Sequence, residues 1–106
     1  MSEFAANLKK LPGVSHLAAI NLLDGEGKVA ATIENKAGSQ GSLALYNYLA
    51  LTYGAITPEA ARKGVELYAE HVEDARQHPG KHPNIDRLLG LTDKALTLRV
   101  KHVFAA

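Results

Sequence analysis

Three histidines and a carboxylate gather in the second half of the chain. His71, His78 and His82 fall within twelve residues, and Asp74 lies between the first two. Neutral imidazole and carboxylate groups are ligands that zinc and related divalent ions take from proteins. On one helix, however, the seven-residue step from His71 to His78 is a rise of about 10 Å, too long for both to bind one ion. His78 and His82 are the better pair, with Asp74 or Asp86 as a third ligand. The spacing matches no zinc motif, and we expect solvated or capping histidines and no bound metal.

Residues 78–86, which begin at His78, form the most polar segment between two expected helices. Lys81, His82 and Asn84 stand before or at the start of the second of these helices. Unpaired backbone N–H groups and the helix dipole favour an anion at such a position. Together with Asp86, these side chains are candidate ligand-binding residues. The alternative is structural: a Pro-Gly pair turns the chain, and His82 or Asn84 caps the helix.

Residues 37–42, with the sequence AGSQGS, are the second candidate loop. Gly38, Ser39 and Ser42 lie between an expected strand and an expected helix, which is the layout of phosphate-binding loops. The segment lacks the Gly-Lys-Ser/Thr ending of a nucleotide-binding loop and the three-glycine dinucleotide spacing. Ser39 and Ser42 are therefore either ligand-binding residues or helix caps.

Catalytic signatures are not apparent in the sequence. Glu70, Glu73 and Asp74 are close together, but a run of acids on a helix is usually a solvated face. No Ser–His–Asp arrangement stands out from the many Ser and His residues. The chain has no cysteine, which excludes disulfides, thiolate metal sites and cysteine nucleophiles. We assign no catalytic residue and no cofactor.

Composition limits the classes of protein. With 106 residues, 46% of them hydrophobic, we expect one globular domain spanning residues 1–106. Twelve basic and eleven acidic residues leave a net charge of +1, which argues against binding to nucleic acid. The most apolar stretch, residues 43–51, is too short to cross a bilayer, which takes about 20 residues. No secretory signal is evident. We expect a cytoplasmic location and no membrane partner.

Hydrophobic spacing and turn residues predict helix, two strands, three helices and one strand. An Asp-Gly-Glu-Gly turn between two apolar runs predicts a β-hairpin. Thr57 followed by Pro58 and Glu59 predicts a capped helix start. The expected elements are a helix over residues 4–11, strands over 17–23 and 29–35, helices over 43–53, 58–77 and 83–89, and a strand over 96–104.

Because single strands and helices do not alternate, a doubly wound parallel sheet is not expected. The predicted class is α+β, with a small, mainly antiparallel sheet made of the N-terminal hairpin and the C-terminal strand. The helices are expected to pack on one face of this sheet. The last strand alternates apolar and polar residues and is long for an unprotected edge.

Residues 33–42, with the sequence IENKAGSQGS, and residues 78–88, with the sequence HPGKHPNIDRL, resemble a small bacterial family of unknown function. The resemblance extends over nearly the whole chain. It implies a compact bacterial domain and brings no activity, cofactor or catalytic residue with it.

Two functional hypotheses remain open. The first is a non-enzymatic binding or interaction module that forms a homodimer, paired through the last strand. The second is a domain that binds a small anionic ligand, or an enzyme, whose site combines residues 38–42 with residues 78–86. The second hypothesis requires that the two loops meet around one pocket.

Overall fold

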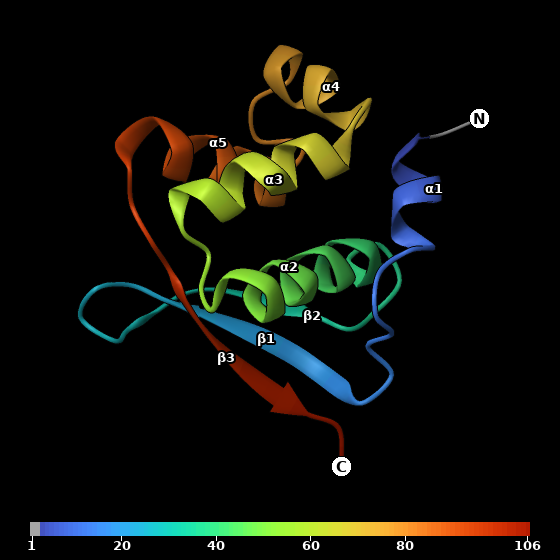
Figure 1. The fold of residues 1–106 in the computed structure, drawn as a ribbon, viewed down its shortest axis with the longest axis vertical. Coiled ribbons are helices and arrows are strands. Elements are labelled where there is room, and N and C mark those ends of the chain that lie inside the picture. Colours follow the sequence, from blue (N-terminus) through green and yellow to red (C-terminus); the bar gives the residue numbers. More distant parts are fainter. Residues whose placement is uncertain (1–2) are drawn as a thin grey trace.

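A computed structural model describes residues 3–106, and this part of the chain contains five helices and three strands. In chain order they are α1 (Glu3–Leu8), β1 (Leu17–Leu23), β2 (Val29–Glu34), α2 (Gln40–Tyr53), α3 (Pro58–Tyr68), α4 (His71–Gln77), α5 (Pro83–Lys94) and β3 (Arg99–Phe104). The three strands form one antiparallel sheet, and the helices lie on one side of it (Figure 1). The predicted α+β class is confirmed.

The sheet has the strand order β2-β1-β3, so β1 is central and both other strands are edges. Ile20 on β1 stands opposite Ile33 on β2 and His102 on β3. Ile20 and Ile33 are buried beneath the helices. The last strand therefore lies at an edge, as the self-association hypothesis requires.

The hairpin between β1 and β2 closes on Asp24. Its Oδ1 accepts hydrogen bonds from the Glu26 and Lys28 N–H groups at 2.8 and 3.0 Å. Gly27 has φ 81, a left-handed conformation in which glycine is not strained. Local turn chemistry thus accounts for the hairpin that the sequence predicted.

The middle layer is α2, which lies between the sheet and the other helices (Figure 1). Its Leu43, Leu45, Tyr46 and Leu49 are fully buried. A helix that is apolar on every side is buried by neighbours on more than one face, and α2 has the sheet on one side and α3 on the other.

The helix predicted over residues 58–77 is two helices, and this prediction was wrong. α3 ends at Tyr68, Ala69 takes a left-handed φ of 52, and α4 begins at His71. A straight helix of 20 residues would be about 30 Å long, close to the longest dimension of the molecule, 34 Å. The break turns α4 onto α5, which buries Ala75 in the same core.

Other boundaries also differ from the sequence prediction: α1 ends at Leu8 and not at residue 11, α2 begins at Gln40 and not at residue 43, and β2 ends at Glu34 and not at residue 35. α5 continues through Gly90 to Lys94 and does not end at residue 89. β3 begins at Arg99, because Leu98 forms an isolated antiparallel bridge with Ile56 and Leu96 is exposed. No helix within residues 3–106 has the length and apolar character needed to cross a membrane.

Candidate functional site

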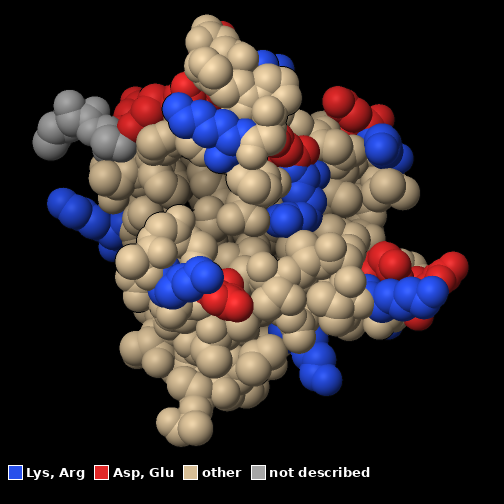
Figure 2. Space-filling view, turned by 180° about the vertical axis from the view of Figure 1, so that it is seen from behind, with Lys and Arg blue, Asp and Glu red and all other residues tan. Residues whose placement is uncertain are grey.

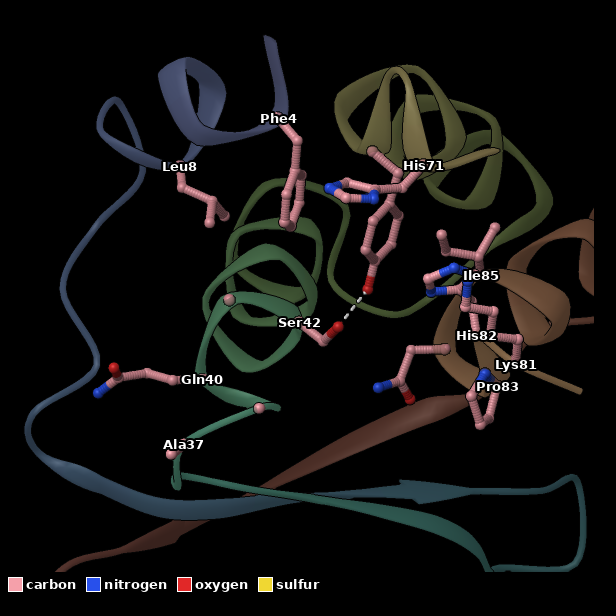
Figure 3. A pocket seen from close by; sticks show the side chains of 14 residues that line it. Phe4, Leu8, Ala37, Gln40, Ser42, His71, Lys81, His82, Pro83 and Ile85 are labelled. Atoms are coloured by element: carbon pink, nitrogen blue, oxygen red, sulfur yellow. Dashed lines mark hydrogen bonds between the residues drawn. The ribbon is translucent and has the colours of Figure 1, made fainter. Parts of the chain in front are cut away.

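A cavity of about 500 Å³ opens between the first turns of α2 and α5, with α1 and the end of α3 as its other walls (Figure 3). The two loops singled out in the sequence, residues 37–42 and residues 78–86, both contribute to its lining, the second through residues 81–85. The face seen in Figure 2 is hollowed near its middle, and Lys and Arg atoms border the hollow.

Tyr46 holds the two loops together. From α2, its buried hydroxyl donates a hydrogen bond to the Asn84 carbonyl oxygen on α5. The Arg87 Nη1 group donates to Asn84 Oδ1 at 2.8 Å and to the Tyr46 oxygen at 3.2 Å. Burial raises the pKa of Tyr46 to about 12, so this hydroxyl remains a neutral donor. The start of α5 is therefore fixed beside α2.

Four of the six residues predicted to bind a ligand line this cavity: Ser42, Lys81, His82 and Asn84. The other two do not. Ser39 Oγ donates to the Glu34 carbonyl oxygen at 2.6 Å, and Asp86 Oδ2 accepts from the Gly80 N–H at 2.9 Å. Both side chains are used to fold their own loops. The expected helix caps are not formed by the N-cap residues, because neither Ser39 before α2 nor His82 before α5 makes a side-chain capping hydrogen bond.

Asp74 on α4 contacts Lys81 and His82, which form the polar wall of the cavity. Its carboxylate contacts His82 Nε2 at 2.6 Å, Lys81 Nζ at 3.1 Å and His78 Nδ1 at 3.2 Å. The hydrogen bond from His82, and then that from Lys81, lower the pKa of Asp74 to about 2. The ionised carboxylate accepts a hydrogen bond from the Nε2–H group of His82. The sequence had suggested Asp74 as a metal ligand or as part of a solvated acidic helix face, and this role was missed.

Unpaired backbone donors lie at both helix starts. Gly41 and Ser42 in the first turn of α2, and Asn84 in the first turn of α5, line the cavity. Within residues 3–106, none of these three N–H groups has a hydrogen-bond acceptor. The Lys81 ammonium group adds a charged donor. The side-chain NH₂ group of Asn84 adds a neutral donor, since the oxygen of the same amide already accepts from Arg87. Donors thus outnumber acceptors in the wall.

The opposite wall is aromatic. Phe4 of α1 stacks on Tyr68 of α3 with ring centroids 5.2 Å apart and an interplanar angle of 16°. His71 meets the same Phe4 edge-on at 4.9 Å, and Leu8 lies beside them (Figure 3). Neither Phe4 nor Leu8 was predicted as a site residue, because only tertiary packing brings α1 next to α3.

Ser42 is not arranged as a nucleophile. Its Oγ accepts a hydrogen bond from the Tyr68 hydroxyl at 2.6 Å (dashed line in Figure 3). Burial raises the pKa of Tyr68 far above its usual value, so this phenol stays protonated and cannot act as a base. Because the Ser42 oxygen accepts a hydrogen bond from Tyr68, the hydroxyl hydrogen of Ser42 is available to a ligand. The arrangement suits binding better than covalent catalysis.

In residues 3–106, no group of three or more His, Asp or Glu side chains is arranged to hold a metal ion. A smaller cavity of about 320 Å³ lies between α3, α4 and α5, and its lining includes Arg62, Arg76 and Asp93. It contains none of the residues predicted to bind a ligand.

The fold and the cavity define a small α+β protein in which helices on one face of an antiparallel sheet enclose a half-polar, half-aromatic pocket. Residues 4–102 match the family described as Uncharacterized protein conserved in bacteria (DUF2322), and the chain belongs to this family. The resemblance to a small bacterial family of unknown function is confirmed. No curated protein and no solved structure matches the chain.

Proposed function

We propose that this protein binds a small organic anion in the cavity between α1, α2 and α5. The observation that carries the proposal is the meeting of two helix starts, with three unpaired N–H groups, around one space that also contains Lys81. Convergent backbone donors at helix N-termini favour a phosphate or carboxylate group. The volume is within the range of ligand-binding pockets, roughly 300–1,000 Å³.

The aromatic wall indicates what the rest of the ligand is. Phe4 and Leu8 offer apolar surface to one side of the cavity, while Lys81 and His82 lie on the other side (Figure 3). A ligand with a flat or apolar body and an anionic head would place each part against the matching wall. Inorganic phosphate alone would use only the polar half.

Lys81 is available to such a ligand even though it contacts Asp74. An ammonium group has three donors, and the Asp74 carboxylate occupies one direction only. Asp74 also prevents an excess of positive charge in the empty pocket. We therefore expect Asp74 to orient Lys81 and His82 and to make no contact with the ligand.

The first test uses three probes in a heteronuclear NMR titration: phenyl phosphate, inorganic phosphate and phenol. We expect phenyl phosphate to bind most tightly and to shift the amide signals of Gly41, Ser42 and Asn84. Lys81→Gln should weaken its binding about tenfold, the value of one charge-assisted hydrogen bond. Lys28→Gln, at the exposed hairpin turn, is the matched control and should bind like the wild type.

Two outcomes would reject the proposal. One is equal binding of phenol and phenyl phosphate, since the anionic group would then contribute nothing. The other is a phenyl phosphate titration that leaves the three amide signals in place, because ligand binding would then involve another surface.

A further inference from the structure

β3 forms one edge of the sheet, and the directions of its backbone groups follow from two contacts. The Ala105 N–H donates to the His16 carbonyl oxygen at 2.9 Å, just before β1, so odd-numbered residues of this segment face β1. Leu98 faces the other way and exchanges two hydrogen bonds with Ile56, at 2.8 and 3.0 Å. Since successive residues of a strand alternate in direction, the even-numbered residues of β3 point away from the sheet.

Three residues therefore present backbone groups at the free edge: Val100, His102 and Phe104. Within residues 3–106, no hydrogen-bond partner covers these groups. The Phe104 side chain is 68% exposed at the end of the same edge. Exposed edges of this kind pair with another chain unless they are covered or interrupted.

The position of Ile56 limits the register that a second copy can take. Because Leu98 already uses both its backbone groups, an antiparallel partner can pair with residues 100, 102 and 104 but not with Leu98. A two-fold axis at His102 pairs these three residues among themselves: His102 with its equivalent, and Val100 with Phe104 of the second copy. A two-fold axis at Val100 would pair His102 with Leu98 of the second copy, whose backbone groups are already bonded to Ile56.

We propose that β3 is a homodimer interface with its two-fold axis at His102, so that the two sheets join into one sheet of six strands. A closed two-fold pair is the commonest arrangement of identical chains. The proposal does not depend on the ligand, since no residue of β3 lines the cavity between α1, α2 and α5.

Side-chain contacts across this axis are favourable. His102 Nε2 donates to the buried Asn47 Oδ1 at 2.9 Å, so the even-numbered side chains of β3 face the helices. Phe104 would lie beside Val100 of the second copy, an aromatic and β-branched pair of the kind that stabilises sheets. On the other face, Lys101 would stand opposite Val103 of the second copy and not opposite its equivalent.

Sedimentation velocity at increasing micromolar concentration tests the interface. We expect the wild type to dimerise, whereas Phe104→Lys and Val100→Pro should be monomers with unchanged circular dichroism. Proline at residue 100 removes an N–H that faces outward, which an edge strand tolerates. The matched control is Val29→Lys, which changes an apolar residue of 56% exposure at the opposite edge and should still dimerise.

A cysteine scan tests the register, because the natural chain has no cysteine. Opposed residues of a hydrogen-bonded pair have Cα atoms about 5.5 Å apart, within the range of roughly 4.4–6.8 Å for disulfides. Under mild oxidation, His102→Cys should cross-link two copies and Val100→Cys should not. The proposal is overturned by a monomeric wild type, by a dimer that survives both edge variants, or by cross-linking at residue 100 in place of 102.

Discussion

Asp74 shows how much one carboxylate contributes to the candidate site. Its partners come from the C-terminal end of α4 and from the loop before α5. The carboxylate thus ties the loop to the helix and orients two groups of the cavity wall. Hydrogen bonds from His82 and Lys81 favour its ionised form, which is why its pKa falls to about 2.

This pKa predicts how stability depends on pH. Asp has a pKa of about 3.9 in unfolded chains, above the folded value of about 2. The contribution of Asp74 to stability is therefore complete above about pH 4 and is lost as the pH falls to about 2. We expect Asp74→Asn to lower the urea midpoint at pH 5, and the difference from wild type to disappear near pH 2.

Asp93→Asn provides the comparison, because Asp93 has no ion pair in residues 3–106. At pH 5 its effect on the urea midpoint should be smaller than that of Asp74→Asn. A difference for Asp74→Asn that is equally large at pH 5 and pH 2 would contradict the assigned role.

At the scale of elements, the contact of α2, α3 and α5 depends on Gly64. A Cβ atom at this position would come within 2.6 Å of Leu88 Cδ1 and 2.9 Å of Leu49 Cδ1. Cβ atoms do not approach other carbons so closely, so the Leu88 and Leu49 side chains would have to shift, and both are fully buried. Helix propensity alone would favour Ala over Gly by about 1 kcal/mol.

Two glycine substitutions should therefore have opposite effects. Gly64→Ala is expected to destabilise the protein by about 1–3 kcal/mol, the usual cost of overpacking a core. Gly90→Ala on α5 has open space around the added methyl group and should stabilise by up to about 1 kcal/mol. Denaturant unfolding measures both; a more stable Gly64→Ala protein would show that the helices pack less tightly than described.

At the scale of the whole molecule, the cavity and the β3 edge are separate surfaces. The cavity is lined by residues from α1 through the first turn of α5, and the edge is formed by residues 100–104. Joining two copies through β3 would leave both cavities open.

Ligand binding and dimerisation should therefore be independent. We expect the monomeric Phe104→Lys variant to bind phenyl phosphate with the affinity of the wild type, and phenyl phosphate to leave the dimer dissociation constant unchanged. Isothermal titration and sedimentation measure the two quantities. A change of several-fold in either one would demonstrate coupling, because linkage is reciprocal.

The elements with strong local signals could be predicted from the sequence alone. Asp24 and Gly27 close the hairpin through contacts within five residues. Thr57 begins α3 by accepting a hydrogen bond from the Ala60 N–H at 3.0 Å. The alternation of apolar and polar residues near the C-terminus indicated β3. These signals are readable because the interacting groups are neighbours in the chain.

Tertiary packing decided the rest. The prediction of one helix over residues 58–77 missed the break at Ala69, because each half keeps the apolar spacing of a helix and the turn is set by packing on α5. The cavity combines Phe4 with Tyr68, and Ser42 with Lys81, pairs whose contact cannot be inferred from spacing. Donor-rich loops marked two parts of the site in the sequence, but their meeting depends on the Tyr46 hydroxyl and the Asn84 carbonyl oxygen. Local hydrogen bonds therefore determined the elements, and long-range burial determined which of their side chains share one space.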